Sequence, residues 1–378
     1  MTTDAYISSS DAPDLPTSIE HASTAWLTAV LRLAGVLSQG GVVGIRHRAN
    51  SAFNSCISHL ALTFSDDAPA DAPRNLLLKL NADHEGGVEV AFYQLVATEP
   101  DHPRVVPACY AAAYSPQSGD SCLLIEDLSI THRSPVSREQ ILALEGVPSP
   151  TYLEQLIVTL ARFHAYWWEH PRLGSGVTQV RWWYNDEEAY RLHVERRCTE
   201  FESFIRDVGD SFPDELRALY ERLLSRMPGL WERCLRPRVT TLKGMTLTNG
   251  DCYLGQFLCP KGSEDGTTYL VDFQAASANF GAYDLSYLLP TFWTPEQRRE
   301  DRREERLLRR YHEALQAHGV RGYGWEQLMT DYRLTVVLMV FDPIHDQVSG
   351  SGKNYWWPKL RCLTGAYQDL ECEALLDG

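Results

Sequence analysis

Paired cysteines and zinc-ligand patterns are absent from this chain of 378 residues. It has nine cysteines, an odd number, with no Cys-x-x-Cys pair and no Cys/His cluster at zinc spacing. A disulfide framework or a structural zinc site is therefore not expected. The sequence instead predicts reduced cysteines in the interior of a cytoplasmic protein.

Long apolar runs and an excess of positive charge are also missing. No stretch approaches the roughly 20 residues that cross a membrane, and the first residues lack a basic region followed by an apolar one. Asp and Glu number 50 against 35 Lys and Arg, which gives a formal charge of −15. This charge disfavours nucleic acid and anionic membranes as partners. It would suit a cationic small molecule, although many cytosolic proteins are this acidic.

Apolar periodicity predicts strands in the first third of the chain and helices in the remainder. Strands are predicted in a hairpin over 41–64, at 75–80 and at 122–125, with helices at 18–34 and 88–98. Further helices are predicted at 151–170, 214–227, 295–318 and 326–341. The change of character near Asp127 predicts two lobes, 1–127 and 128–378, joined by a hinge rather than a flexible linker.

Two aspartates and one amide stand in an order that suits phosphoryl transfer. Asp251 follows an Asn-Gly turn, Gln256 comes five residues later, and Asp272 ends a short apolar run. Such transfer depends on positioning and on charge neutralisation. One Asp can accept the substrate proton, while an amide and a second Asp hold magnesium. Asp251 alone would be an ordinary turn residue, but the combined spacing favours a function.

This segment resembles the aminoglycoside phosphotransferase and choline kinase-like superfamily. The usual string there is His-Gly-Asp, three variable residues, Gly-Asn, and later an apolar strand that ends in Asp. Asn249 stands in place of the His and Gln256 in place of the Asn, and Leu-Gly-Gln is similar to the variant of bacterial maltokinases and glucosamine kinases. Gln offers the same carbonyl ligand on a stem one methylene longer, and Asn can form local hydrogen bonds. The resemblance spans roughly residues 40–365.

The resemblance implies a two-lobed, protein-kinase-like α+β fold. A small N-lobe would carry an antiparallel sheet, and a larger, mainly helical C-lobe would carry Asp251, Gln256 and Asp272. The implied activity uses ATP or GTP and Mg²⁺ to phosphorylate a hydroxyl of an aminoglycoside, amino sugar, sugar or amino alcohol. Asp251 would be the catalytic base, and Gln256 and Asp272 would bind the metal. The protein is expected to be a monomer or a homodimer.

Lys79 interrupts an apolar strand, where a buried ammonium needs a charged partner. The resemblance implies that Lys79 holds the nucleotide phosphates and that Glu89, on the next helix, holds Lys79. The alternative is an edge-strand lysine that deters aggregation. Glu126 and Leu128 flank a segment that resembles the hinge of the family, where backbone groups hold adenine.

Glycine-rich phosphate-binding strings are missing, since the chain has neither G-x-G-x-x-G nor a Walker A motif. Residues 50–55 occupy the hairpin position instead, and the hydroxyls of Ser51 and Ser55 are candidates to contact phosphate. An ordinary polar turn is the alternative.

The acceptor region is the least marked part of the sequence. Its candidate residues are Asp342, His345, Asp346, Tyr355 and Trp356. They could bind a polar or cationic acceptor, although a loop after a helix also carries such residues for solvation. Two other functions remain open: a nucleotide-binding pseudokinase or regulatory module without turnover, and a magnesium-dependent hydrolase. The hydrolase would leave Lys79 and the hinge-like segment unexplained.

Overall fold

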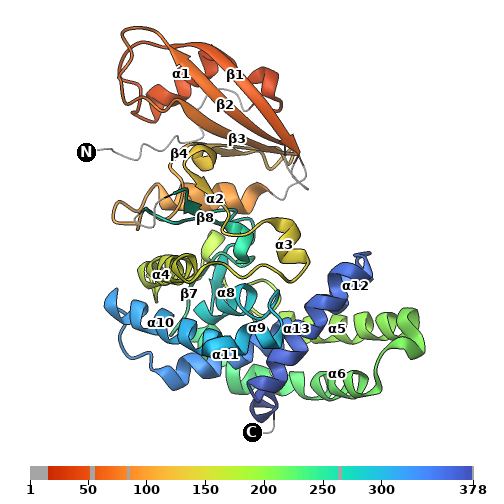
Figure 1. The fold of residues 1–378 in the computed structure, drawn as a ribbon. Helices are drawn as coiled ribbons and strands as arrows, with labels where there is room; N and C mark the ends of the chain where they lie inside the picture. Colours follow the sequence, from red (N-terminus) through yellow and green to blue (C-terminus); the bar gives the residue numbers. More distant parts are fainter. Residues whose placement is uncertain (1–15, 52–55, 83–85, 263–265, 377–378) are drawn as a thin grey trace. The chain divides into compact units, whose positions relative to one another are not determined.

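Two compact units make up the protein, which we describe from a computed structural model that places residues 16–51, 56–82, 86–262 and 266–376 (Figure 1). One unit comprises Met1–Arg133 and Leu258–Ala276, and the other comprises Ser134–Phe257 and Ser277–Gly378. The boundary therefore differs from the predicted lobes 1–127 and 128–378, because a segment that carries Asp272 belongs to the first unit.

Backbone hydrogen bonds explain why this late segment joins the first unit. Strand β6 (His132–Arg133) pairs with β8 (Phe257–Pro260). Beyond it, β9 (Tyr269–Leu270) is tied to the first part of the chain, since the Leu270 amide donates to the Val105 carbonyl at 2.7 Å.

An antiparallel sheet of five strands, in the order β1-β2-β3-β5-β4, forms the frame of the first unit. The strands are β1 (Val42–Ser51), β2 (Cys56–Phe64), β3 (Asn75–Asn81), β4 (Cys109–Tyr114) and β5 (Ser121–Glu126). Side chains alternate along β3, so that Leu76, Leu78 and Leu80 are buried in one apolar cluster with helix α1 (Thr24–Leu33). Lys79 therefore points to the opposite face of the sheet from α1.

Helix α2 (Gly86–Val96) packs against β4 and β5 and begins at a position that requires glycine. A Cβ atom on Gly86 would lie 1.8 Å from the Ser121 hydroxyl oxygen and 2.6 Å from the Ser121 Cβ. The close approach brings the first turn of α2, with Glu89, against the sheet.

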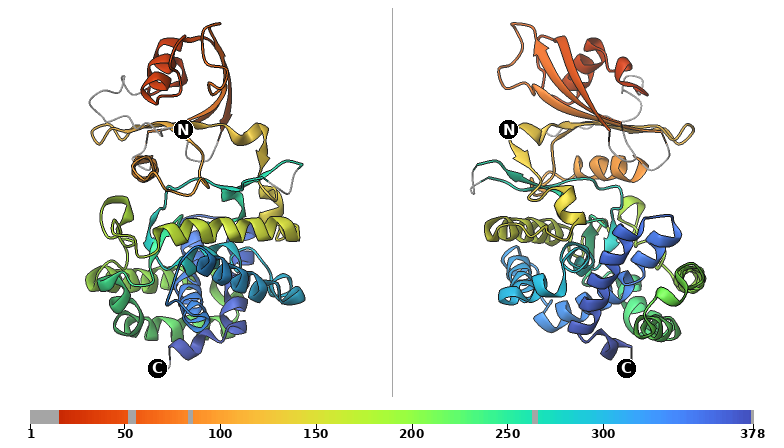
Figure 2. Two further views of the ribbon diagram at one scale, coloured as in Figure 1. Left: turned by 90° about the vertical axis from the view of Figure 1, so that its left-hand side faces the viewer. Right: turned by 45° about the vertical axis from the view of Figure 1, so that its right-hand side comes forward.

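The second unit is mainly helical (Figure 2). Its helices are α3 (Arg138–Leu142), α4 (Pro150–Trp167), α5 (Glu187–Val208), α6 (Asp214–Arg226), α7 (Arg236–Thr241), α8 (Gly281–Leu288), α9 (Pro295–Arg299), α10 (Arg303–Ala317), α11 (Trp325–Met339), α12 (Asp342–Val348) and α13 (Lys353–Asp369). Strands β7 (Thr246–Thr248) and β10 (Ser277–Asn279) pair antiparallel. Helix α4 packs against α10 and β7, α8 against α11, and α12 against α5 and α13.

Most of the predicted elements are present, but the helix predicted over 295–318 is broken. Asp301 and Arg302 have φ angles of 48° and 55°, in the left-handed region, so that α9 and α10 are separate helices. Within the part of the chain that the structure describes, no helix combines the length and apolar character needed to span a membrane.

We expect Gly86→Ala to lower the free energy of unfolding by about 1–3 kcal/mol, because the added methyl group overlaps Ser121 in a packed region. Urea denaturation followed by circular dichroism measures this change. Gly87→Ala is the matched control, since the atoms nearest to its Cβ would be those of the Tyr114 ring, at 3.2 Å and beyond. Equal stability of the two variants would contradict the proposed packing requirement.

Candidate active site

Lys79 forms two ion pairs within the first unit. Its ammonium lies 2.7 Å from a Glu89 carboxylate oxygen and 2.8 Å from an Asp272 carboxylate oxygen. The side chains of Lys79 and Glu89 are 12% and 3% exposed, whereas that of Asp272 is 30% exposed. The structure therefore brings three of the predicted site residues together, from β3, from α2 and from the residues after β9.

Burial alone would lower the pKa of Lys79, but the Glu89 and Asp272 carboxylates outweigh it and raise the pKa above its ordinary value. Burial raises the pKa of Glu89, and the ion pair with Lys79 opposes this shift. Lys79 thus remains a positive charge in a place where an unpaired cation would be costly. A fixed cation beside a partly exposed carboxylate suits the binding of phosphate groups and their metal ion.

Asp272 has an unusual backbone conformation that its neighbours support. Its φ angle is 61°, in the left-handed region, which costs a non-glycine residue roughly 1–2 kcal/mol. The next residue, Phe273, stacks on Phe92 of α2 with ring centroids 3.6 Å apart and an interplanar angle of 9°. This stacking, together with the ion pair to Lys79, holds Asp272 in place.

Asp251 lies in a tight loop of the second unit. Gly250 has a φ angle of 82°, and the Asn249 side-chain oxygen accepts a hydrogen bond from the Asp251 amide at 3.2 Å. The Gln256 amide nitrogen donates to an Asp251 carboxylate oxygen at 3.3 Å. Asn249 therefore organises the loop locally, at the position where the family has His.

A buried carboxylate holds this loop through hydrogen bonds to its backbone. Asp284, on α8, accepts hydrogen bonds from the Asn249 amide at 2.8 Å and from the Gly250 amide at 2.9 Å. His164 lies between Asp284, at 3.1 Å, and the Tyr311 hydroxyl, at 2.7 Å. Asp284 and His164 are completely buried, so this hydrogen-bond network positions the loop that carries Asp251 rather than a ligand.

Backbone hydrogen bonds hold the hinge-like segment in place. The Glu126 amide donates to the Ala108 carbonyl at 2.8 Å, and buried Leu128 begins a short 3₁₀ turn. Asp127, near which the lobe boundary was predicted, caps this turn, and its carboxylate bonds the His59 ring at 2.7 Å. The roles of Glu126 and Leu128 in adenine binding stay predictions.

The phosphate-contact prediction falls on residues of which little is described. Ser51 ends β1 and pairs with Cys56, while Ser55 lies outside the described residues. Contact of either hydroxyl with phosphate stays a prediction.

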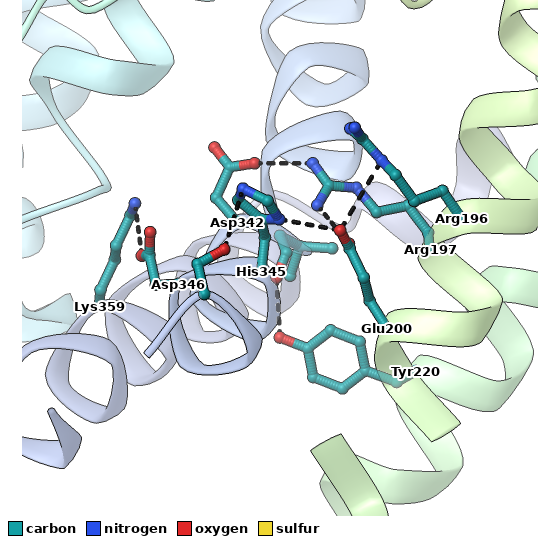
Figure 3. Close-up of polar contacts among 10 residues, drawn as sticks. Arg196, Arg197, Glu200, Tyr220, Asp342, His345, Asp346 and Lys359 are labelled. Carbon is teal, nitrogen blue, oxygen red and sulfur yellow. Dashed lines mark hydrogen bonds and ion pairs between the residues drawn. The ribbon is translucent and has the colours of Figure 1, made fainter. Parts of the chain in front are cut away.

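The acceptor candidates lie on α12 and α13, and most of them already have partners in the protein. Asp342 pairs with Arg197 at 3.2 Å, the His345 ring with Glu200 at 2.8 Å, and Asp346 with Lys359 at 2.9 Å (Figure 3).

The aromatic candidates differ from each other in position. Trp356 is 5% exposed and packs edge-on against Phe204, at 5.3 Å between centroids, so it is placed as a core residue rather than as a wall of a site. Tyr355 is half-buried, with its ring centroid 6.5 Å from that of Phe292. Burial raises the pKa of Tyr355; the Lys359 ammonium opposes this shift, and the Asp346, Asp251 and Asp342 carboxylates add to it.

Sequence reasoning missed the basic partners Arg197 and Lys359. Lys359 follows Tyr355 by four residues and Arg197 precedes Glu200 by three, which is the spacing of neighbours on one helix face. That spacing was the available signal, but it is informative only when α5 and α13 are known to be helices.

The donor groups fit a magnesium ion better than a metal ion whose ligands all come from the protein. In the described parts of the chain, no three His, Cys, Asp or Glu side chains gather in a way that could hold a metal. Magnesium needs no such cage, because it binds one or two protein oxygens and keeps waters and substrate phosphates as its other ligands. In the first unit, the Asp272 carboxylate is partly exposed. In the second unit, the Gln256 amide nitrogen faces Asp251, which leaves its carbonyl oxygen for another partner. The roles of both residues as metal ligands stay predictions.

A small antiparallel-sheet unit with an ion-paired lysine, together with a helical unit with a braced Asp loop, defines the protein-kinase-like class of folds. The chain belongs to the ecdysteroid kinase-like family, whose family model matches residues 89–321. The predicted membership of the choline kinase-like superfamily is confirmed. No curated protein matches the sequence significantly.

Solved structures share the fold at low sequence identity. An ethanolamine kinase from Plasmodium vivax matches with a TM-score of 0.52 and 10% identity, covering 87% of this chain and 85% of its own. A choline kinase from Cryptosporidium parvum matches with a TM-score of 0.52 and 11% identity, covering 88% and 90%. The predicted protein-kinase-like α+β fold is confirmed by this likeness.

We expect Asp284→Asn to destabilise the second unit by about 2–3 kcal/mol, because a buried carboxylate that accepts two backbone amides loses charge and one acceptor. Tyr311→Phe, which removes only the hydroxyl next to His164, is expected to cost about 1 kcal/mol. Urea unfolding monitored by tryptophan fluorescence compares the two. An Asp284→Asn variant as stable as the native protein would contradict the bracing role.

Proposed function

We propose that the protein transfers the γ-phosphoryl group of ATP, with magnesium, to a hydroxyl group of a small molecule. The observation that carries this proposal is the double ion pair of Lys79 with Glu89 and Asp272. Family membership supports a kinase, since the family is named for kinase-like proteins. We expect the activity in the cytoplasm, where ATP and magnesium are abundant, from a monomer or a homodimer.

In this function Lys79 binds the nucleotide phosphates. Glu89 fixes the ammonium, so its position does not have to be established when the nucleotide arrives. Bound magnesium would neutralise charge on the phosphates, and Asp272 and Gln256 are the residues that would hold it. Glu126 and Leu128 flank the segment proposed to receive adenine.

Asp251 orients the acceptor. Its carboxylate accepts a hydrogen bond from the acceptor hydroxyl and receives the proton late in the reaction. The hydroxyl oxygen forms a bond to the γ-phosphorus while the bond from that phosphorus to the ADP oxygen breaks, and ADP leaves. Gln256 and Asn249 keep the Asp251 carboxylate and backbone in place.

The acceptor class is not fixed by family or fold. The family takes its name from an ecdysteroid, and the two structural neighbours are named for ethanolamine and choline. A fold hosts many acceptors, so aminoglycosides, amino sugars, sugars and amino alcohols all belong in the first substrate pools.

Magnesium-ATP turnover with pooled small alcohols, read by mass spectrometry for phosphoryl gain, tests the proposal. We expect Asp251→Asn to keep nucleotide affinity and to lose about 10²–10⁴-fold in turnover, the usual contribution of a general base. Nucleotide binding without any phosphorylated product would favour the alternative, a pseudokinase or regulatory module. Failure to bind nucleotide at all would contradict the proposal.

Lys79→Met should weaken magnesium-ATP binding by about 10–100-fold, because a charge-assisted contact to phosphate is worth about 1.5–3 kcal/mol. Isothermal titration calorimetry measures the affinity. Lys243→Met, which removes an exposed lysine of the second unit, should leave it unchanged. Equal affinities for the two variants would show that Lys79 does not contact the nucleotide.

A further inference from the structure

Helices α5, α12 and α13 carry a set of ion pairs that we name the acceptor-side charge cluster: Arg197, Glu200, Asp342, His345, Asp346 and Lys359 (Figure 3). Arg197 bonds Glu200 at 2.8 Å and Asp342 at 3.2 Å. Lys359 bonds Asp346 at 2.9 Å. Each of the three carboxylates is therefore paired with a cation of the protein itself.

Lys359 is the most deeply buried member of the cluster. Its side chain is 2% exposed, and its ammonium lies 5.8 Å from the Tyr287 ring centroid and 5.7 Å from that of Tyr355. Burial would lower the pKa of Lys359, but the Asp342 and Asp346 carboxylates raise it. Lys359 is thus a permanent positive charge between two aromatic rings.

The same two rings lie near the proposed catalytic aspartate. The Asp251 charge, after burial, contributes to the raised pKa values of Tyr287 and Tyr355. A row of aromatic rings also links the loop of Asp251 with Tyr355. The ring centroid of Tyr253 lies 6.2 Å from that of Phe292, which lies 6.5 Å from that of Tyr355. The charge cluster therefore borders the surroundings of Asp251 inside one unit.

Within the acceptor-side charge cluster, basic side chains balance the carboxylates. Besides Arg197 and Lys359, Arg196 lies 3.7 Å from Glu200, and Arg181 is near enough to Asp342 for that carboxylate to help raise its pKa. A site built for a cationic alcohol keeps carboxylates for the ligand, because burying an uncompensated cation is costly. Here basic side chains of the chain already occupy the positions next to the carboxylates.

Resting on the proposed kinase activity, we propose that the acceptor is an alcohol without positive charge, and that Lys359 is the residue that excludes cationic acceptors. Like charges at a desolvated site repel, so discrimination arises from Lys359 as well as from contacts to the preferred acceptor. This narrows the acceptors to neutral alcohols and sugars, and removes aminoglycosides, amino sugars and amino alcohols.

Pairs of acceptors that differ only in charge test the inference. Suitable pairs are 3,3-dimethylbutan-1-ol with choline, and glucose with glucosamine, each added to a larger pool of neutral and cationic alcohols. We expect the native protein to phosphorylate neutral acceptors with kcat/KM at least about tenfold above that of their cationic partners. Higher kcat/KM for the cationic partners would overturn the inference and leave the kinase activity intact. No phosphorylation of any acceptor would overturn the proposed function, and the inference with it.

Variants that change the cluster charge in opposite directions provide the second test. Lys359→Met leaves Asp346 without its cation and is expected to shift the ratio of kcat/KM toward cationic acceptors by about tenfold or more. Asp346→Asn should shift it the opposite way. The double variant Asp346→Asn/Lys359→Met removes both charges and carries no unpaired buried ion, so it tests the loss of the Lys359 charge even if the single variant is unstable. Its ratio should also shift toward cationic acceptors.

Lys353→Met is the matched control, because Lys353 is an exposed lysine on the same helix, over the Trp357 ring. Its ratio should equal that of the native protein. Identical ratios in Lys359→Met, Asp346→Asn and Lys353→Met would show that the cluster does not select the charge of the acceptor.

Discussion

The double ion pair of Lys79 is the interaction on which the first unit and its proposed chemistry depend. It joins a central strand to α2 through Glu89 and to a segment almost two hundred residues later through Asp272. Removing either carboxylate would leave a largely buried cation less compensated, which is a severe penalty in a packed interior. The pairing also explains why the late segment around Asp272 folds with the first unit, although residues 134–257 of the second unit precede it in the chain.

The loop that carries Asp251 in the second unit is held by a comparable buried charge. Asp284 accepts hydrogen bonds from the backbone amides of the turn before Asp251, the proposed catalytic base. In turn, Asp284 is held by His164, a histidine with partners on both ring nitrogens. Buried polar groups of this kind must be fully satisfied, so a hydrogen-bond network fixes the loop more rigidly than packing alone. Asn249 takes part through its backbone amide, which donates to Asp284, and through its side-chain oxygen, which accepts from the Asp251 amide.

Much of the fold was predictable because apolar residues recur at strand or helix spacing, as in β3 and α4. Helix α5 escaped prediction because its buried face includes Arg197 and Glu200, whose burial depends on partners from elsewhere. The break before α10 was hidden because Asp301 and Arg302 adopt left-handed conformations that their residue types do not demand. Similarly, Lys79 could be singled out as a lysine in an apolar strand, whereas Lys359 could not, since its importance comes from contacts between helices. The short spacings among Asp251, Gln256 and Asp272 could be recognised in the sequence, whereas ion pairs between distant elements could not.

The central claim is that this chain moves a phosphoryl group from ATP to an alcohol. Turnover of ATP labelled with ¹⁸O in the γ-phosphoryl group, with mass spectrometry of both the acceptor and inorganic phosphate, tests it most directly. The account predicts that the labelled phosphoryl oxygens appear in a phosphorylated alcohol, and that this product is lost in Asp251→Asn. Label found only in inorganic phosphate would identify a hydrolase, and unchanged ATP bound to the protein would identify a binding module; either result would contradict the account.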